Sequence, residues 1–161
     1  MPATALPPFQ SLIDAHAGEL LRFLRGMVGA DEADDCLQET LIAALRAYPG
    51  FDGANPRAWL LTIARNKATD AHRARARRPE PLEQPDLRPS PVAVPGGSRA
   101  EEIWAEVAAL PPKQRAALVL RFATDLRYRE VAAVIGCSEE AARRSVHEGL
   151  SKLRETRGVA A

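Results

Sequence analysis

Apolar residues recur along most of the chain with a period near 3.6, which predicts amphipathic α-helices. No segment alternates apolar and polar residues well enough to predict a strand. In the N-terminal part the pattern predicts three helices, over residues 8–27, 31–48 and 55–78. In the C-terminal part it predicts four more, over residues 98–110, 111–122, 128–135 and 138–155. The predicted fold class is therefore all-α.

Local signals set the expected ends of these helices. Asn55 precedes a proline, and Ser138 precedes the last helix, so both are expected N-caps. Asp31 is the expected N-cap of the second helix, and Gly26 and Gly29 are expected to weaken the end of the first. The second helix has one predicted apolar stripe, formed by Leu37, Leu41, Ala44 and Tyr48.

A proline-rich segment separates the two helical parts. Residues 79–97 contain six prolines and end in a glycine pair, so they cannot form a helix interior. In an extended conformation such a linker could span roughly 60 Å. The sequence predicts a domain over residues 1–78, a linker over residues 79–97 and a second domain over residues 98–161.

Charge is distributed unevenly although the formal net charge is only +1. Residues 31–39 carry five acids and no base, whereas residues 65–78 carry six arginines and lysines against one acid. Adjacent segments of opposite sign suggest two different partners.

Several functional classes are disfavoured by the sequence. No apolar run approaches the roughly 18 residues needed to cross a bilayer, and no secretory signal is visible, so we expect a cytoplasmic protein without membrane insertion. Cys36 and Cys137 are too far apart in sequence to suggest a metal site or a disulfide framework, and we expect both to be small buried hydrophobes. No nucleophile–base set or phosphate-binding glycine loop occurs, which predicts no enzyme activity, no cofactor and no small-molecule substrate.

The last two predicted helices form a helix-turn-helix pattern, with Gly136 in the turn. On a helical wheel Arg143, Arg144 and His147 lie opposite the apolar side of the last helix, with Glu140 beside them. In a helix-turn-helix such outward residues contact base edges in the major groove, where arginine suits guanine. An ordinary helical hairpin with a solvated face is the alternative. His147, His16 and His72 lack partners at ligand spacing and are expected to be structural or surface residues.

The second predicted helix carries a polar stripe opposite its apolar one. We call it the acidic stripe, and it consists of Asp34, Asp35, Gln38 and Glu39. Acids beyond the first turn gain little from the helix dipole, so the stripe has no evident internal purpose. It is either a solvated face or a docking surface for a basic protein partner.

The third predicted helix carries a line of amides and charges that we call the polar stripe, formed by Asn66, Asp70, Arg73 and Arg77. Such side chains can hydrogen-bond bases and neutralise phosphates together. Trp59 lies on the same side two turns earlier, where an aromatic ring could stack on an unpaired base. A tryptophan packed in the core beside Ile63 is the alternative.

Five segments together resemble a known family. They are residues 33–40 (ADDCLQET), 51–53 (FDG), 59–66 (WLLTIARN), 110–115 (LPPKQR) and 118–122 (LVLRF), followed by the helix-turn-helix. Their order and spacing are similar to those of the extracytoplasmic-function sigma factors, the smallest members of the sigma-70 family. The resemblance covers nearly the whole chain except the linker and the two termini.

The resemblance implies a role for each surface. The acidic stripe would bind the clamp coiled coil of core RNA polymerase. Residues 51–57 would capture a base flipped from the downstream promoter element. The residues expected at that element are Phe51, Asp52, Asn55 and Trp59 together with the polar stripe. Those expected at the upstream element are Ser138, Glu140, Arg143, Arg144 and His147.

The last helix departs from the family pattern, because Ser145 and Glu148 stand where basic residues are frequent. Glu148 would either shift the register on DNA or accept a hydrogen bond from a cytosine amino group. The family also implies control by a separate anti-sigma protein. The alternatives are a sigma-like decoy that binds an anti-sigma protein without a promoter, and a conventional repressor or activator that uses the helix-turn-helix alone.

Overall fold

A computed structural model of the protein describes residues 5–77 and 98–159, and every regular element in those ranges is a helix. The prediction of an all-α fold is confirmed. The N-terminal bundle consists of α1 (Phe9–Val28), α2 (Ala30–Ala47), the short 3-10 helix η1 (Tyr48–Gly50) and α3 (Pro56–Arg77). The C-terminal bundle consists of α4 (Ser98–Ala108), α5 (Pro112–Phe122), α6 (Tyr128–Ile135) and α7 (Glu139–Val159). The predicted linker, residues 79–97, and Arg78 lie outside the described residues.

Three of the expected helix ends are confirmed by hydrogen bonds or backbone angles. The Asn55 side chain accepts a hydrogen bond from the Ala58 amide at 3.2 Å, and Ser138 Oγ accepts one from the Ala141 amide at 3.1 Å. Gly136 ends α6 in the left-handed conformation, with a φ of 80°. These signals act over three or four residues, which is why the sequence alone located them.

The junction of α1 and α2 differs from the expectation. Asp31 is not the N-cap but lies inside the first turn of α2, and Gly29 occupies the cap position with a φ of 83°. The Gly29 amide donates to Arg25 O at 3.0 Å while its carbonyl accepts from the Ala33 amide at 3.1 Å. One residue therefore joins two helices, and its positive φ favours glycine over residues with a side chain.

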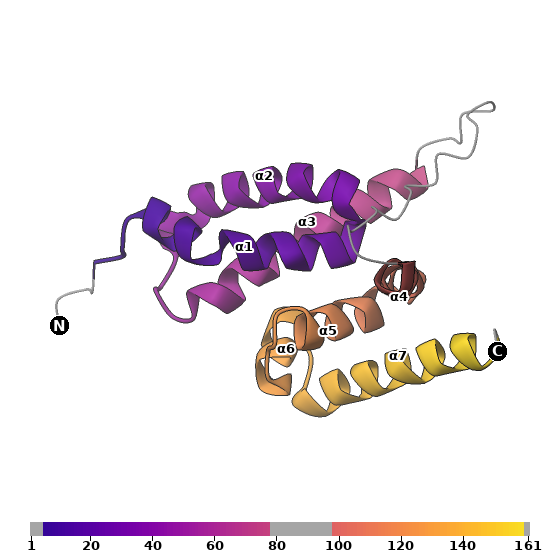
Figure 1. Ribbon diagram of the computed structural model, residues 1–161. Helices are drawn as coiled ribbons and strands as arrows, with labels where there is room; N and C mark the ends of the chain where they lie inside the picture. The colour runs from indigo at the N-terminus through magenta and orange to yellow at the C-terminus, as the bar shows by residue number, and fades with distance from the viewer. Residues whose placement is uncertain (1–4, 78–97, 160–161) are drawn as a thin grey trace.

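Burial on α2 follows a line rotated from the predicted stripe. Ala33, Cys36, Thr40 and Ala44 are buried, whereas Leu37, Leu41 and Tyr48 are only partly buried. Small residues face the core because α1 and α3 both pack closely against this helix (Figure 1). Thr40 satisfies its buried hydroxyl by donating to Cys36 O at 2.7 Å.

Two apolar residues of the C-terminal bundle lie at least partly outside its core. Phe122, the last residue of α5, is 63% exposed, and Cys137 is half-buried rather than buried. Helix α7 continues to Val159, four residues beyond its predicted end at Glu155. Both cysteines are free thiols.

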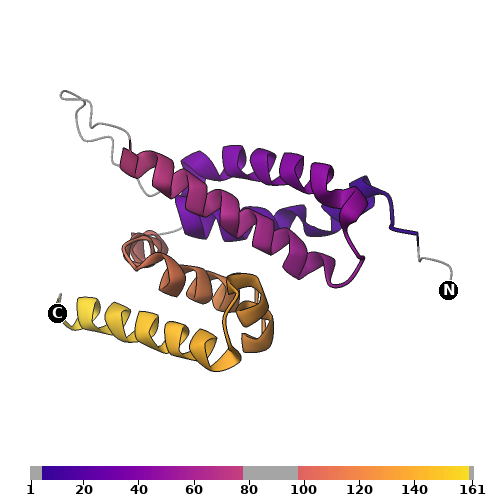
Figure 2. The same cartoon turned by 180° about the vertical axis from the view of Figure 1, so that it is seen from behind.

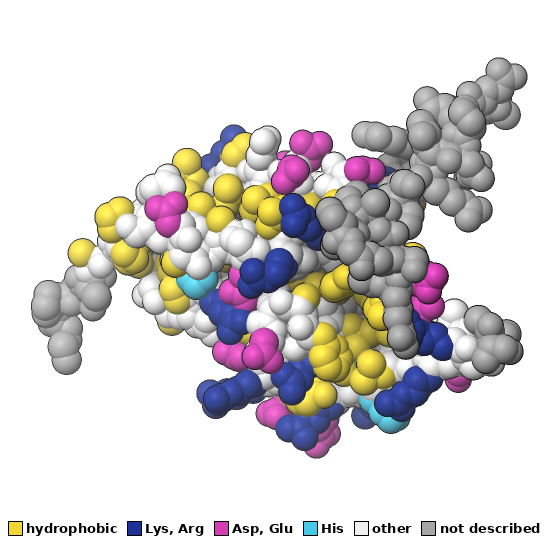
Figure 3. Space-filling view, in the orientation of Figure 1, with side chains coloured by type: hydrophobic (Ala, Val, Ile, Leu, Met, Phe, Trp, Pro, Cys, Tyr) yellow, Lys and Arg dark blue, Asp and Glu magenta, His cyan; other side chains and the backbone are white. Residues whose placement is uncertain are grey.

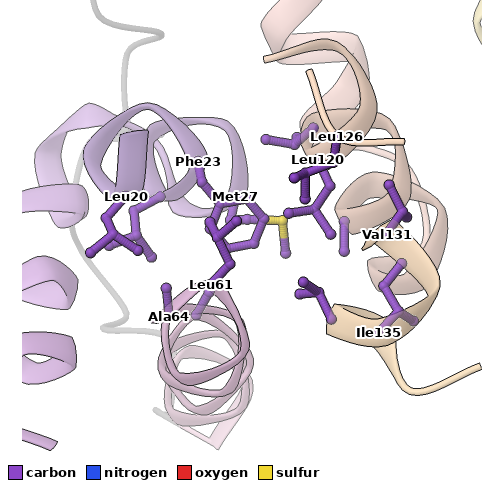
Figure 4. Packing of buried hydrophobic residues seen from close by; sticks show 14 of the residues in the cluster. Leu20, Phe23, Met27, Leu61, Ala64, Leu120, Leu126, Val131 and Ile135 are labelled. Atoms are coloured by element: carbon purple, nitrogen blue, oxygen red, sulfur yellow. The ribbon is translucent and has the colours of Figure 1, made fainter. Parts of the chain in front are cut away.

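The two bundles pack directly against each other, as the front and back views agree (Figures 1 and 2). Their buried residues form one continuous hydrophobic cluster. At the junction, Met27 lies between Phe23 and Leu61 of the N-terminal bundle and residues of the C-terminal bundle (Figure 4). The latter are Leu120, Leu126, Val131 and Ile135. Burial of these side chains on both sides means that the junction is held largely by the hydrophobic effect.

A buried arginine adds polar contacts to this apolar junction. Arg115 on α5 is 7% exposed, and its Nη2 donates to Ala108 O at 2.6 Å and to Leu110 O at 2.9 Å. Its Nη1 lies 2.7 Å from His72 Nε2 on α3 and 3.4 Å from Met27 O at the end of α1. His72 is thus a structural residue, as the sequence predicted, and its hydrogen-bond partners come from distant parts of the chain.

Gly26 allows the bundles to approach closely. A Cβ atom at this position would lie 2.8 Å from Val119 Cγ1 and 3.1 Å from Trp104 Cζ3, both in the C-terminal bundle. The expectation that Gly26 weakens the end of α1 is wrong, since the helix continues through it to Val28. Its missing side chain serves the junction instead.

We expect the substitution Gly26→Ala to lower the free energy of unfolding by about 1–3 kcal/mol, because the added methyl group overpacks the junction. Urea unfolding followed by circular dichroism measures the change. Gly18→Ala is the matched control on the same helix, where a Cβ meets only Arg22 Nη1, at 3.9 Å. That control should raise stability by about 0.5–1 kcal/mol through better helix propensity. Equal effects of the two substitutions would contradict this account of Gly26.

Candidate nucleic-acid and protein interfaces

The acidic stripe lies on the outer surface of α2. Asp34, Asp35, Gln38 and Glu39 are all exposed, and among the described residues none of them forms a hydrogen bond or an ion pair. Figure 3 shows acidic side chains interspersed with hydrophobic ones along the upper edge of the molecule, over α2. Their carboxylates are free to meet a basic partner.

Two exposed apolar residues extend the acidic stripe along the same helix. Ile42 is 51% exposed and Leu45 is 55% exposed, and Ile42 follows Gln38 by one helical turn. Sequence analysis missed both residues because they lie on neither of the stripes that it assigned to this helix. Their helical positions could have indicated their exposure, because both lie away from the line of residues that faces the core. The outer surface of α2 therefore combines negative charge with apolar area.

A groove with a volume of about 400 Å³ runs between α2 and α3. Its walls include Asp35 and Glu39 of the acidic stripe and Asp70 of the polar stripe. The two stripes therefore meet at this groove. Arg75 Nε donates to Glu32 Oε1 at 2.6 Å, so one ion pair links the walls.

The Cys36 thiol lines this groove but is poorly reactive. Burial raises its pKa to about 11, and the neighbouring carboxylates of Glu39, Glu32 and Asp35 add to the shift. The thiol therefore stays protonated at neutral pH, and a protonated thiol is a poor nucleophile and metal ligand.

The polar stripe of α3 is a single exposed line, as its spacing predicted. Asn66, Asp70, Arg73 and Arg77 are all exposed. Arg75 lies off this line and is engaged by Glu32. The two stripe arginines form no ion pair with a described residue and are available to phosphates.

The segment between η1 and α3 carries an aromatic cluster. The rings of Phe51 and Trp59 are stacked with centroids 4.3 Å apart, and Tyr48 lies 6.3 Å from each of them. Trp59 is half-buried and packs against the core, which agrees with the core alternative, and the rest of its surface stays accessible. Asp52 accepts a hydrogen bond from the Ala54 amide at 2.9 Å, which fixes the turn. The structure thus brings Phe51, Trp59 and the turn residues together.

Arg57, at the start of α3, connects this segment to the C-terminal bundle. Its Nε donates to Glu19 Oε1 at 2.6 Å, and its Nη2 donates to Thr124 O. Thr124 lies in the turn between α5 and α6, so one side chain contacts both bundles. The predicted base-capturing segment is therefore tied to the junction in this structure.

The helix-turn-helix consists of α6, the turn at Gly136 and α7. Glu140, Arg143, Arg144 and His147 are exposed on α7, as expected. Arg143 donates to Glu139 at 2.8 Å, and its guanidinium lies 5.2 Å from the centre of the Tyr128 ring. Arg144 forms no such contact with a described residue, so it is the more freely placed of the two.

Ser145 and Glu148, the two residues that depart from the family pattern, have different surroundings in the structure. Ser145 is only 6% exposed, so it faces the core and does not interrupt the outer face of α7. Glu148 is exposed and accepts a hydrogen bond from Gln114 Nε2 at 3.2 Å. Glu148 thus has a partner within the bundle.

A basic pocket beside the helix-turn-helix was missed by sequence analysis. Tyr128 lies between the guanidinium groups of Arg121 and Arg143, at 5.0 and 5.2 Å from its ring centre. Arg127, Arg129 and Glu139 complete the walls. Figure 3 shows basic side chains together with acidic ones at this end of the C-terminal bundle. The arginines come from three helices, so only the fold brings them together.

Within residues 5–77 and 98–159, no cluster of histidine, cysteine and acidic residues could hold a metal ion. None of the helices described here is long and apolar enough to cross a bilayer.

Comparison with protein families finds two matches along the chain. The model for sigma-70 region 2 matches residues 12–78, and the model for sigma-70 region 4 matches residues 100–153. The matched ranges correspond to the N-terminal and C-terminal bundles in that order.

Several curated proteins are similar over most of the chain. The ECF RNA polymerase sigma factor EcfG of Rhodopseudomonas palustris is 37% identical over 128 residues, covering 77% of this chain and 70% of its own. SigX of Bacillus subtilis, also an ECF sigma factor, is 31% identical over 160 residues, with coverages of 91% and 82%. SigE of Mycolicibacterium smegmatis is 31% identical, and the match covers 94% of this chain but 62% of that relative.

Two solved structures share the fold. The sigma factor RpoE of Bartonella quintana, in complex with the anti-sigma factor NepR, matches with a TM-score of 0.75 and 25% identity, covering 95% of this chain and 98% of RpoE. CnrH, in complex with the cytosolic domain of CnrY, matches with a TM-score of 0.70 and 24% identity, covering 95% and 89%.

Proposed function

Because the chain belongs to the ECF sigma factors of the sigma-70 family, we propose that it binds core RNA polymerase and directs promoter-specific transcription initiation. The observation that carries the proposal is the pairing of two distinct surfaces in one chain. An exposed acidic and apolar helix lies in the bundle that matches region 2, and a basic helix-turn-helix lies in the bundle that matches region 4. A sigma factor of this kind acts by binding, without chemistry of its own, and would act in the cytoplasm.

The outer surface of α2 is the proposed docking site for polymerase. The acidic stripe supplies carboxylates without internal partners among the described residues, and Ile42 and Leu45 supply apolar area beside them. Charge complementarity would steer a basic partner to this surface, while burial of the two apolar side chains would slow its dissociation. The combination suits a basic, amphipathic helical partner such as the clamp coiled coil.

The segment around η1 and the face of α3 are proposed to bind the melted downstream promoter element. Phe51 and Trp59 offer aromatic faces for an unpaired base, with Asp52 and Asn55 shaping the turn beside them. Asn66 and Asp70 can hydrogen-bond bases, and Arg73 and Arg77 can neutralise the strand beyond them. Extruding a base costs a few kcal/mol, which such a surface would offset for the correct base.

The helix-turn-helix is proposed to bind the upstream promoter element. Arg144 and His147 extend from the outer face of α7 toward base edges, with Ser138 and Glu140 near the start of the helix. Arg143 is held against Tyr128 and Glu139, so it would contact the backbone beside the basic pocket as well as the neighbouring base.

Binding two promoter elements requires the two bundles to separate. The elements lie more than one turn of DNA apart, and each turn measures about 34–36 Å. Packed as they are in the structure, the bundles bring both surfaces into one compact body (Figure 2). We propose that residues 1–78 and 98–161 act as domains joined by residues 79–97, which could span roughly 60 Å.

A separate anti-sigma protein is the proposed regulator of this chain. RpoE, whose fold is similar over 95% of the chain, was solved with an anti-sigma factor bound. A decoy that binds an anti-sigma protein without a promoter would not need Arg73, Arg77 and Arg144 exposed, yet all three are. A repressor using the helix-turn-helix alone would leave the acidic stripe without a role.

Run-off transcription across a promoter library tests the proposal. Core polymerase supplied with this protein should produce transcripts from a defined subset of promoters, and core polymerase alone should not. The absence of any promoter-dependent transcript, with binding to polymerase intact, would favour the decoy.

Reversing two charges of the acidic stripe should weaken polymerase binding. We expect the double substitution Asp35→Lys and Glu39→Lys to cost about 1 kcal/mol or more in affinity for core polymerase, because like charges then face each other. Biolayer interferometry with immobilised core enzyme measures it. The control reverses Asp14 and Glu155, two exposed acids outside the stripe, with the same change in net charge. If both pairs weaken binding equally, the docking surface is misplaced.

Removing one arginine of α7 should weaken binding to the upstream element. Arg144→Ala is expected to cost about 1–3 kcal/mol and to relax preference at one base pair, as loss of a base contact does. Fluorescence anisotropy on duplexes changed one base pair at a time measures both effects. Arg154→Ala, an exposed arginine nearly three turns further along α7, should leave the preference unchanged. An unchanged affinity for Arg144→Ala would place this side chain off the DNA.

A further inference from the structure

The junction between the bundles contains a buried positive charge without a negative partner. Arg115 is 7% exposed, yet no carboxylate among the described residues contacts it. Its acceptors are the carbonyls of Met27, Ala108 and Leu110 and the ring of His72. A buried charge held only by neutral dipoles is sensitive to any second charge nearby, because little water is present to screen it.

The contact with Arg115 favours one protonation state of His72. Arginine can only donate, so a hydrogen bond from Arg115 Nη1, 2.7 Å away, requires the lone pair of His72 Nε2. That contact therefore favours the neutral ring with its proton on Nδ1. Met27 O lies 2.9 Å from the same Nε2 and also within reach of Arg115 Nη1. When the ring is neutral, Arg115 Nη1 thus donates to both His72 Nε2 and Met27 O.

A proton on Nε2 would reverse this arrangement. The new N–H would point at Met27 O and compete with Arg115 for that carbonyl. It would also place an imidazolium against the guanidinium at a separation of 2.7 Å. Two cations cannot hold that separation in a buried site without a counterion.

The other charged groups around His72 do not supply a counterion. From α3, Arg75 adds a further positive charge, and from α2, Glu32 supplies the nearest acid. Glu32 is engaged by Arg75, whose Nε donates to it at 2.6 Å. The end of α1 contributes the Met27 carbonyl and α5 contributes Arg115. Burial lowers the pKa of His72, and the charges of Arg115 and Arg75 lower it further, against the opposing effects of the Met27 carbonyl and of Glu32.

We propose that His72 is a proton-sensitive switch at the junction, and that protonation of its ring weakens the packing of the two bundles against each other. The partners of the switch come from both bundles, with His72 and Met27 on one side and Arg115 on the other. Weakening this contact frees Arg57 from Thr124 as the bundles part. The inference goes beyond the proposed function, since it concerns the free chain without polymerase or promoter.

The direction of the pH dependence follows from linkage. In separated bundles the His72 ring is solvated and its pKa returns to about 6.5, above its value at the junction. Packing of the two bundles against each other is therefore at full strength above about pH 6.5. It weakens progressively as the pH falls through the lowered pKa that His72 has at the junction. For each unit by which the His72 pKa is lower in the packed bundles than in the separated ones, protonation lowers the equilibrium constant for packing by up to about tenfold.

Small-angle X-ray scattering of the full chain tests the switch. The radius of gyration should increase as the pH falls from about 7.5 to about 5.5, while circular dichroism keeps its helical signal. His72→Gln stays neutral and can accept from Arg115 with its amide oxygen, so this variant should remain compact at both pH values. His72→Lys carries a permanent charge and should be expanded already at the higher pH.

The remaining histidines provide matched controls. His16→Gln and His147→Gln remove the other two histidines of the chain, and both variants should expand as the unmodified chain does. Expansion of His72→Gln at low pH, or no expansion of the unmodified chain, would overturn the proposal. Loss of helical signal together with expansion would also overturn it, because acid would then unfold the bundles rather than separate them. None of these readouts depends on transcription, so failure of the switch and failure of the sigma activity are distinguishable.

Discussion

The relation between the two halves of the molecule depends on one buried guanidinium group. Removing a charge from water costs several kcal/mol, and Arg115 offsets that cost with carbonyls at the ends of α1 and α4 and with the ring of His72. The C-terminal end of a helix carries partial negative charge, so these carbonyls suit a cation better than isolated ones would. The acceptors come from α1, from α3 and from the α4–α5 corner, and Nε finds no acceptor among the described residues. A shift of any one element would leave more of the charge unsatisfied, so Arg115 fixes the α4–α5 corner and the junction together.

Around this junction, the surfaces of the molecule differ in their charge. The acidic stripe faces outward from α2, the polar stripe runs along α3, and the basic pocket lies at the start of the helix-turn-helix. A near-neutral chain can therefore carry one acidic surface, one of mixed charge and one basic surface. The groove between α2 and α3 is where the first two meet, and Asp70 lies in its wall. Its carboxylate shares the groove with those of Asp35 and Glu39, so a charge brought to one stripe would change the electrostatic potential at the other.

Much of this architecture could be predicted from the sequence because the signals are local. The caps at Asn55 and Ser138 act within one turn, and helical periodicity placed the exposed stripes correctly. The remainder depends on contacts between residues far apart in the chain. His72 meets Arg115 across 43 residues, and the basic pocket draws arginines from three helices. The N-cap predicted at Asp31 was wrong for another reason. Asp31 is a residue type that caps helices well, but Gly29 occupies the cap position because it joins α1 directly to α2. Ser145 lies three residues after the buried Ala142, a spacing that shares its face, but its polar side chain gave no sign of burial.

The glycine at position 26 has a consequence for how such a chain can evolve. Modular proteins diversify by exchanging domains, which requires that each domain tolerate a new neighbour. Here the surface of α1 is hollowed at one residue to receive Val119 and Trp104. A C-terminal bundle from a relative with different side chains at those two positions would leave a void or a clash. Recombination between relatives would therefore tend to preserve promoter recognition in each half while losing the compact state, and the three positions must change as a set.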